Sequence, residues 1–405
     1  MTLSSQIPEG LPRLGADAAQ HCLAVCRMLK ERIHASDGFL PFEQWMGLAL
    51  YAPGLGYYVA GSTKLGSHSP EGDFTTAPEM TPLFGQTLAR QAAQILQASA
   101  STKVLEFGAG TGALAASLIP ALQQLGIEPD YQILELSPDL RARQQATLAG
   151  VSTSVTWLDE LPQSFSGCVL ANEVLDAMPT TLFKWDDDGS LMEVGVRMAQ
   201  ATPAAPAADT DEIPVFELAL RKASPALNQL VGERMPALPG YLSEINLQAE
   251  AWVRELGSWL KQGAALLIDY GFPQREYYHP QRAEGTLMCH FRHHTHGQPL
   301  IYPGLQDITA HVDFTAMADA ALAGGLDVLG YTSQARFLMN AGMIDLLTPP
   351  EGQGADTLAQ ARDLSAVQKL LSEAEMGELF KVLAISKQID GPLLGFMRGD
   401  RRDRL

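Results

Sequence analysis

The most constraining feature of this sequence is the stretch KVLEFGAGTGALAASL, residues 103–118, in which an apolar run meets three closely spaced glycines and then an alanine-rich segment. The pattern predicts a buried strand, a tight loop and a helix. Gly108 and Gly110 lack a Cβ, so a ligand can approach the backbone, and they tolerate a positive φ. The following helix would point free N–H groups at that ligand. The third glycine, Gly112, comes one residue earlier than in the dinucleotide fingerprint G-x-G-x-x-G, which disfavours NAD and leaves an ordinary strand-to-helix turn as the alternative.

Two acids flank this loop in the sequence. Glu106 lies two residues before the first glycine, where it would repel a pyrophosphate and attract a ligand that carries an ammonium and a sulfonium, such as S-adenosylmethionine. Glu135 ends the next apolar stretch, at about the distance where an acid reaches a ribose diol in βαβ units. Because NAD and S-adenosylmethionine both contain that ribose, Glu135 does not discriminate between them.

Strand and helix patterns alternate from residue 103 to about residue 175, which predicts a parallel, doubly wound sheet. Ligands of such sheets sit at the carboxyl ends of the strands, so Gly108, Glu135, Asp159 and Asn172 should line one crevice. We expect Asp159 to meet an adenine amino group, with a turn or helix cap as the alternative. Asn172 is expected to contact the amino acid part of the cofactor.

Five separated motifs carry a resemblance to a known family. The E-x-G-x-G-x-G loop resembles class I S-adenosylmethionine-dependent methyltransferases, and GDFTTAPE, NEVLDAMP, LIDYG and DITAHVDF resemble the family of the mitochondrial complex I assembly methyltransferase and its bacterial MidA-like relatives. The resemblance runs from about Phe42 to Phe396. It implies a Rossmann-like α/β fold that binds S-adenosylmethionine and methylates a protein arginine. It also makes GDFTTAPE part of a lid, with four residues near the cofactor: Asp73, Phe74, Thr75 and Thr76.

NEVLDAMP follows the fourth predicted strand, where a substrate beside the methyl group would be held. Its two acids, Glu173 and Asp176, would share one face if the segment turns helically, and paired carboxylates suit the forked donors of a guanidinium. Arginine stays protonated in water, so a methylating site must orient it and accept a proton. The first acid resembles the first glutamate of the paired-acid loop in protein arginine methyltransferases, whereas the second departs from that pattern. A helix cap or a structural ion pair is the alternative role for these acids.

The histidines suggest weaker hypotheses. His290, His293, His294 and His296 lie close together in the sequence, but only Cys289 accompanies them at ligand spacing, so no metal site is expected. His311 and Asp313, inside DITAHVDF, could form a pair that holds the imidazole in one tautomer. Neighbouring residues of this kind can also simply pack together.

The chain is expected to divide into five parts. Residues 1–100 form a helical and lid region, residues 101–179 the first part of the Rossmann-like core, and residues 180–245 an antiparallel insertion that faces the substrate. The insertion is signalled by a hairpin pattern around Asp188-Gly189 and a return strand, VFELALRK. Residues 246–398 complete the core. The last seven residues, 399–405, have the sequence GDRRDRL and are expected to form a solvated, frayed tail.

Composition limits the compartment and the partners. A net charge of −18 argues against a nucleic-acid methyltransferase. The four cysteines show no paired C-x-x-C spacing, and we see no signal core, no transit peptide and no long apolar run, so a reduced, cytoplasmic and bacterial setting without membrane insertion is the simplest hypothesis.

The sequence therefore predicts a methyltransferase that uses S-adenosylmethionine, with a protein arginine as the acceptor implied by the resemblance. Three alternatives stay open: a small-molecule methyltransferase, an assembly factor that binds the cofactor without catalysis, and, disfavoured by the glycine spacing, a nicotinamide-dependent oxidoreductase.

Overall fold

The computed structural model describes residues 7–60, 75–199, 215–347 and 357–405, and the chain divides into two compact units. The first unit, in chain order, contains Met1–Lys64, Ala177–Gln248 and Arg275–Ala310. The second contains Leu65–Asp176, Ala249–Gln274 and His311–Leu405. Each unit is described below by itself, and we call the second the sheet unit because it contains the predicted doubly wound sheet.

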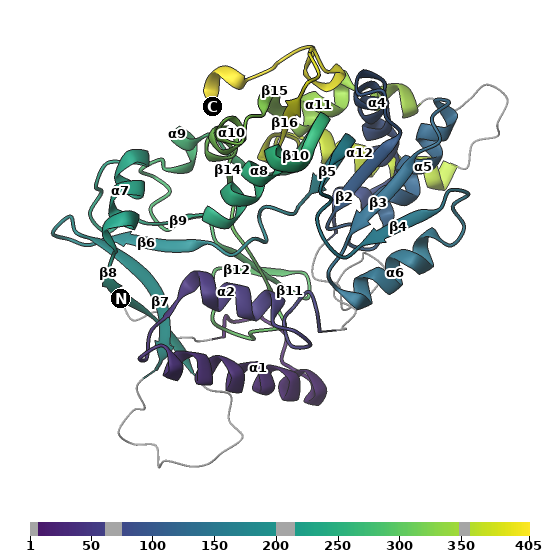
Figure 1. Cartoon of the computed structure of the whole chain (residues 1–405). Coiled ribbons are helices and arrows are strands. Elements are labelled where there is room, and N and C mark those ends of the chain that lie inside the picture. Colours follow the sequence, from purple (N-terminus) through teal and green to yellow (C-terminus); the bar gives the residue numbers. More distant parts are fainter. Residues whose placement is uncertain (1–6, 61–74, 200–214, 348–356) are drawn as a thin grey trace. The chain divides into compact units, whose positions relative to one another are not determined.

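The main sheet of the sheet unit has the strand order β15-β16-β10-β5-β2-β3-β4, with β14 paired to β10 (Figure 1). The five strands from β10 to β4 run parallel, and β16 is antiparallel to both of its neighbours. The strands are β2 (Lys103–Phe107), β3 (Asp130–Leu134), β4 (Val155–Leu158), β5 (Phe165–Asn172), β10 (Leu260–Phe272), β14 (Val312–Asp313), β15 (Asp327–Ser333) and β16 (Phe380–Lys387). The predicted Rossmann-like α/β sheet is confirmed.

The strand order reverses between β2 and β5, because the chain proceeds from β2 outward to β3 and β4 and then returns to form β5 on the other side of β2. In doubly wound sheets this reversal opens a crevice at the carboxyl ends of the two strands. The glycine loop follows β2, and Asn172 ends β5. The topology therefore brings the two most informative motifs of the sequence to one edge of the sheet.

Helices cover the sheet, and capping side chains mark where some of them begin. Thr81 caps α4, since its side chain accepts a hydrogen bond from the N–H of Leu83, and α4 packs against α5. The helical segments of this unit are α3 (Ala77–Met80), α4 (Pro82–Ala98), α5 (Ala113–Gln124), α6 (Pro138–Leu148), α8 (Leu247–Trp259), α10 (Phe314–Ala323), α11 (Gln334–Asn340), α12 (Thr357–Leu371), α13 (Met376–Leu379) and the short 3₁₀ turns Met343–Leu347, Leu394–Phe396 and Arg402–Arg404.

The core of the sheet unit lies between these helices and the parallel strands. Residues 264–268 of β10 are all buried apolar residues, because helices cover both faces of the sheet. Leu88 on α4 and Leu118 on α5 belong to the same buried cluster as Leu266. The core thus fixes the carboxyl ends of β2, β5 and β10 in one rigid frame.

The other unit is built from antiparallel sheets. One has the order β1-β7-β6-β9 with β8 paired to β7, which confirms the antiparallel insertion, and the other has the order β12-β11-β13. Its elements are α1 (Ala16–Ala35), β1 (Leu40–Pro41), α2 (Phe42–Tyr51), β6 (Thr181–Trp185), β7 (Leu191–Met198), β8 (Phe216–Lys222), α7 (Pro225–Arg234), β9 (Leu242–Ile245), α9 (Gln274–Tyr277), β11 (Met288–Phe291), β12 (His294–His296) and β13 (Asp307–Thr309).

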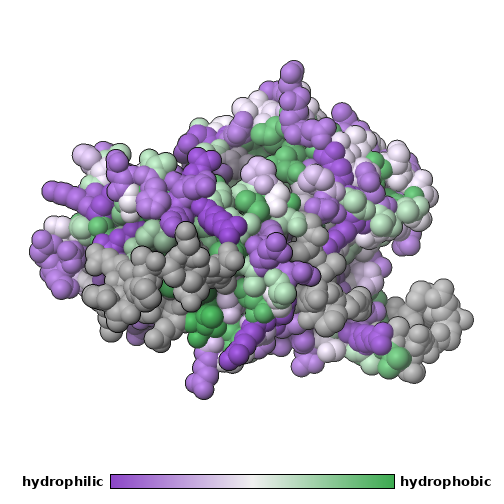
Figure 2. Space-filling model, turned by 90° about the horizontal axis from the view of Figure 1, so that it is seen from below, coloured by the Kyte–Doolittle hydropathy of each residue, from purple (hydrophilic) through white to green (hydrophobic). Residues whose placement is uncertain are grey.

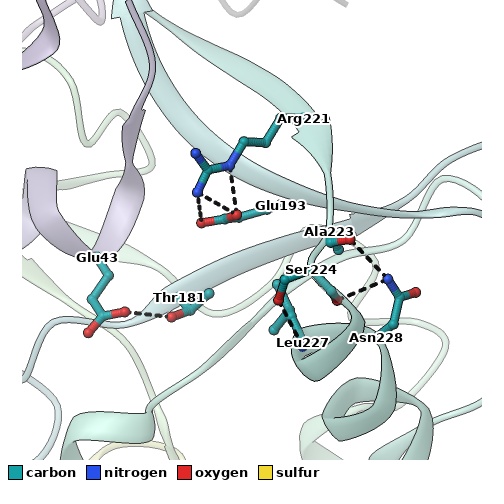
Figure 3. A network of polar contacts seen from close by, with 8 residues as sticks. All are labelled: Glu43, Thr181, Glu193, Arg221, Ala223, Ser224, Leu227 and Asn228. Carbon is teal, nitrogen blue, oxygen red and sulfur yellow. Dashed lines mark hydrogen bonds and ion pairs between the residues drawn. The ribbon is translucent and has the colours of Figure 1, made fainter. Parts of the chain in front are cut away.

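Polar contacts join neighbouring elements of this antiparallel sheet and its helices (Figure 3). Arg221 on β8 donates two hydrogen bonds to Glu193 on β7, directly opposite it in the ladder. Thr181 at the start of β6 donates to Glu43 of α2 at 2.8 Å, and Ser224 caps α7 through the N–H of Leu227. Strands β6 and β7 pair around the predicted turn at Asp188-Gly189, and the contact of Thr181 with Glu43 connects this hairpin to α2.

The C-terminal residues correct one prediction. We expected residues 399–405 to be a frayed tail, but Arg401 donates from its backbone to Tyr331 of β15 and from its guanidinium to Glu378, and Asp400 accepts from the N–H of Tyr331. The basic side chains find carboxylates and strand-edge backbone groups in their own unit, and these contacts order the segment.

Figure 2 shows the hydropathy of one face of the protein. The face in Figure 2 carries mostly hydrophilic side chains, with hydrophobic ones in smaller groups between them. Within the described ranges, no helix has the length and apolar character that a membrane crossing needs.

Candidate active site

The glycine loop after β2 has the backbone that its sequence predicts. Gly108, Gly110 and Gly112 have φ of +60°, +52° and +85°, the left-handed region in which a side chain causes strain. A Cβ on Gly110 would meet no atom within 4 Å, so the loop borders open space there. Gly112 is the N-cap of α5 and offers no side chain to its first N–H groups. The loop therefore presents bare backbone to the space that a cofactor would fill.

Glu106 lies beneath this loop. Its side chain is only 3 % exposed, and its Oε2 accepts a hydrogen bond from the hydroxyl of Tyr131 at 2.7 Å. Burial raises the pKa of Glu106 to about 7, the Tyr131 hydrogen bond opposes that rise, and the charge of Glu135 adds to it. The two acids that flank the loop in the sequence are thus close enough to interact electrostatically.

Glu135, just after β3, is held by donors on both carboxylate oxygens. Its Oε1 accepts from the N–H of Ser137 at 2.9 Å, and its Oε2 accepts from Nε2 of Gln144 at 2.9 Å. Gln144 also donates to the carbonyl oxygen of Gly110 at 3.1 Å. Burial raises the pKa of Glu135, and these hydrogen bonds counteract it. Its carboxylate is therefore fixed at the crevice, with 8 % of the residue exposed.

The end of the GDFTTAPE motif packs onto the loop. Asp73 and Phe74 lie outside the described residues, whereas Thr75 and Thr76 lead into the short helix α3. Thr76 and Glu79 form a capping box, and the other oxygen of Glu79 accepts from the hydroxyl of Thr111 in the glycine loop at 3.0 Å. This contact joins the motif to the loop.

The NEVLDAMP motif forms a turn after β5. Glu173 has a φ of +53°, rare for a residue with a side chain, and its N–H donates to the carbonyl oxygen of Ile268 on β10 at 2.9 Å. Nδ2 of Asn172 donates to Oε1 of Glu173 at 3.1 Å, and the N–H of Ala77 also donates to this carboxylate. The helical turn that would have put the two acids on one face does not form: residues 173–176 are not helical, and Glu173 adopts the left-handed conformation.

Asp269 near the end of β10 organises this turn. One of its oxygens accepts from the N–H groups of Leu175 and Asp176, at 3.0 and 3.2 Å, and the other accepts from the N–H of Tyr270 at 2.9 Å. The hydroxyl of Tyr270 donates to Oδ2 of Asp176 at 2.5 Å. A buried carboxylate thus holds the backbone of the turn, and a tyrosine holds its second acid.

Glu173, Asp176 and Asp269 form an acid cluster, in which the charge of Asp176 acts on both of the other carboxyl groups. Burial raises the pKa of Glu173 to about 8, and the charge of Asp176 adds to the rise. The pKa of Asp269 lies well above its ordinary value, first because of burial and then because of the charges of Asp176 and Glu173. Such a cluster attracts cations and can take up protons near neutral pH.

Three other residues of the sequence analysis make contacts outside the acid cluster itself, although the ring of His311 also lies edge-on to Tyr270, which holds Asp176, with centroids 5.0 Å apart. Asp159 follows β4, its side chain is 85 % exposed, and Arg141 donates to it at 2.8 Å. Asp313 caps α10 by accepting from the N–H groups of Thr315 and Ala316. The ring of His311 stacks on Phe272 with centroids 5.3 Å apart.

The clustered histidines lie in the other unit, on the strands and turn of the β11–β12 hairpin. Burial lowers the pKa of His296 to about 4 and also lowers the pKa of His290. In the part of the chain that the structure describes, no group of three or more histidines, cysteines or acids is placed to hold a metal ion.

Sequence reasoning did not assign roles to four residues that organise the site: Glu79, Gln144, Asp269 and Tyr270. Three of them lie inside motifs that the sequence analysis singled out, and the T-x-x-E spacing of Thr76 and Glu79 is a readable capping signal. Gln144 gives no such signal, because it is an ordinary helix residue until the fold brings it to Gly110.

A family model of S-adenosyl-L-methionine-dependent methyltransferases matches residues 87–332, which include the glycine loop and the acid cluster. A superfamily member from Burkholderia thailandensis, crystallised bound to S-adenosyl-homocysteine, has 48 % sequence identity and a TM-score of 0.90, covering 98 % of this chain and all of that one.

Curated relatives extend the comparison to animals. The protein arginine methyltransferase NDUFAF7 homolog, mitochondrial, of Drosophila melanogaster is 26 % identical, covering 93 % of this chain and 88 % of the relative. The protein arginine methyltransferase NDUFAF7, mitochondrial, of Danio rerio is 28 % identical, covering 89 % and 86 %.

These names contradict the predicted cytoplasmic location, because both relatives are mitochondrial by name. Reduced cysteines and an acidic composition do not distinguish the two compartments, so the composition could not support that prediction.

Proposed function

The chain belongs to this family of S-adenosyl-L-methionine-dependent methyltransferases, and we propose that it transfers a methyl group to the guanidinium of an arginine side chain in a protein. The observation that carries the proposal is the acid cluster at the carboxyl ends of β5 and β10, beside the glycine loop after β2. The curated relatives named as protein arginine methyltransferases support it.

The residues of the loop fit the cofactor. S-adenosylmethionine supplies a methyl group on a sulfonium sulfur, which is a good leaving group for transfer to nitrogen. Open space at Gly110 accepts the ligand against the backbone, Glu135 offers a fixed acceptor for the ribose hydroxyls, and Glu106 contributes negative charge near the cationic end. Asn172, at the end of β5, is the candidate contact for the amino acid part.

The acid cluster fits the acceptor. A guanidinium is cationic, planar and forked, so two neighbouring carboxylates can orient it and localise its charge on one side. Glu173 and Asp176 interact through their charges, and Tyr270 holds Asp176 in place. Such orientation places one guanidinium nitrogen toward the methyl donor and aligns it for in-line displacement.

Glu173 is the candidate general base. The attacking nitrogen must lose a proton as its bond to the methyl carbon forms, and a carboxylate whose pKa is about 8 accepts that proton more readily than an ordinary glutamate. The proton would then rest on Glu173, while breakage of the bond between the methyl carbon and the sulfonium sulfur would leave a neutral thioether. Asn172 and the N–H of Ala77 orient the carboxylate that does this work.

The decisive test is incubation of the protein with methyl-labelled S-adenosylmethionine and a cognate lysate, followed by mass spectrometry of the labelled protein. We expect label on arginine nitrogen, and none with Glu173→Gln. Glu255→Gln, an exposed acid on α8, is the matched control and should retain full labelling. Label on another residue type or on a small molecule, or cofactor binding without any methylated product, would contradict the proposal.

A further inference from the structure

Gln144 on α6 is completely buried although it carries a polar amide. Its Nε2 donates to the carbonyl oxygen of Gly110 at 3.1 Å and to Oε2 of Glu135 at 2.9 Å. Its Oε1 accepts from Nε1 of Trp157 on β4 at 2.9 Å. Both donor hydrogens and the acceptor are therefore used, and the partners come from three successive strand-and-helix repeats of the sheet.

The orientation of this amide is determined by its partners. The indole N–H of Trp157 can only donate, so the oxygen of Gln144 must face it. The NH₂ group then faces the carbonyl oxygen of Gly110 and the carboxylate of Glu135, which both accept hydrogen bonds. Reversing the amide would place oxygen against two acceptors and leave the indole without a partner, which is costly in a buried site.

The backbone of α6 also touches the glycine loop. A Cβ added at Gly112 would come to 3.4 Å from the Cα of Gln144, so the backbone of α6 lies close beside the loop at this glycine. The side chain of Gln144 is thus anchored at a fixed distance from the loop. It can act as a rigid link between the backbone that faces the cofactor and the acid that faces its ribose.

We propose that Gln144 is a positioning residue for the cofactor: oriented by Trp157, it holds the Gly110 peptide and the Glu135 carboxylate in the geometry that binds the nucleoside of S-adenosylmethionine. The inference rests on Glu135 as the ribose ligand in the proposed function. Three N–H donors, from Leu136, Ser137 and Gln144, engage this carboxylate, which has about four acceptor positions, so it can still receive a ribose hydroxyl.

The test measures the Kd of S-adenosyl-homocysteine by calorimetry, well below the melting temperature of each variant. Gln144→Leu should raise the Kd about tenfold or more, because hydrogen bonds to a charged group each contribute roughly this factor. Gln145→Leu is the matched control, since it makes the same change one residue along the same helix on an exposed side chain, and it should leave the Kd unchanged.

A double-mutant cycle separates positioning from general stability. Gln144→Leu and Glu135→Gln should each weaken binding, and the double variant should lose much less than the product of the two factors, because Gln144 acts through Glu135. Both single variants should also lose the preference for S-adenosyl-homocysteine over its 2′-deoxyribose analogue. Independent, multiplicative losses, or an unchanged Kd with only a lowered melting temperature, would overturn the inference.

Trp157→Phe keeps the test valid if Gln144→Leu does not fold. It removes only the indole donor that orients the amide, so we expect the Kd to rise severalfold with the fold intact; an unchanged Kd would contradict the role of Trp157. A failure of the proposed function can be distinguished from a failure of this inference. If Glu135→Gln binds S-adenosyl-homocysteine normally, the assignment of Glu135 to the ribose is wrong. If Glu135→Gln weakens binding but Gln144→Leu does not, only the role of Gln144 is rejected.

Discussion

The acids of the glycine loop and those of the acid cluster lie at the same edge of one sheet, yet they are stabilised differently. Glu135 and Glu106 each accept hydrogen bonds from neutral donors, Gln144 and Tyr131 among them. In the acid cluster, the charge of Asp176 adds to the raised pKa of Glu173, and the charges of Asp176 and Glu173 add to that of Asp269. Neutral donors hold carboxylates on both sides, but the acid cluster brings three acids together where the loop has two, so we expect a cationic substrate to relieve more repulsion there.

The largest expected effect is a loss of turnover when the acid cluster, which would bind the methyl acceptor, is altered and the glycine loop is left intact. Glu173→Gln should reduce kcat by at least about a hundredfold, since a positioned general base contributes about 10²–10⁴ in rate. The Kd of S-adenosyl-homocysteine should change less than about twofold, because the 173–176 turn would keep its Asp269 contacts. Calorimetry and steady-state rates check this, and a parallel loss of binding and turnover would show that the two sides are not separable.

The pH dependence of the rate tests whether Glu173 of the acid cluster acts as the base. Glu173 must be deprotonated to act, so kcat/KM should rise with pH through about 8 in the free enzyme. A bound guanidinium favours the carboxylate, so the corresponding limb of kcat should lie at lower pH. A rate profile measured for the Glu173→Gln variant should lack this limb, and an unchanged profile would assign the titration to another group.

Asp269→Asn should affect stability more than cofactor binding. The substitution replaces a buried carboxylate that accepts three N–H groups, and we expect the free energy of unfolding to fall by about 1–3 kcal/mol. Turnover should fall as well, because Asp176 loses its backbone anchor. Chemical denaturation measures the first effect, and an equally stable variant would show that the turn does not depend on Asp269.

Gly110→Ala tests the cofactor side. Gly110 has a φ of +52°, which costs a residue with a side chain roughly 1–2 kcal/mol, and the new methyl group would project into the open space beside the loop. The Kd of S-adenosyl-homocysteine should rise about tenfold, with kcat at saturation retained. Gly126→Ala, also at positive φ with open space around its Cβ, is the matched control and should cost stability without weakening binding.

The smallest expected effect concerns Glu106. Below its pKa of about 7 this residue is neutral, and above it the residue is anionic, so the affinity for the sulfonium S-adenosylmethionine should rise severalfold from pH 6 to pH 8. S-adenosyl-homocysteine, which has no sulfonium, should respond less. The Glu106→Gln variant should show equal pH slopes for both ligands, and equal slopes in the unmodified protein would remove Glu106 from cofactor recognition.

Raised acid pKa values also predict how stability varies with pH. Glu173 has an ordinary pKa of 4.5 and a pKa of about 8 in the folded protein, so the folded state binds more protons between these values. Its contribution is complete below about pH 4.5 and is lost as pH rises to about 8. Glu173→Gln should flatten that part of the curve.

Local sequence patterns predicted the elements of the sheet unit well, because each depends on neighbouring residues. The glycine spacing predicted the loop, and the alternation of apolar strands with helices predicted the parallel sheet. Glu173 shows the limit of that reasoning: the sequence allowed a helical turn, whereas the turn is held by the carbonyl oxygen of Ile268, which accepts from Glu173, and by the carboxylate of Asp269, which accepts from Leu175.

The sequence by itself determined that a strand, a glycine loop and a helix would form, and that acids would follow two of the strands, since these features depend on spacing within a few residues. Only the tertiary structure decided that Asp269 would support the turn of Asp176 and that Gln144 would join Gly110 to Glu135. These contacts link residues 34 and 93 positions apart in the chain. They form because the strand order of the sheet brings distant segments to one edge, and no local pattern records that order.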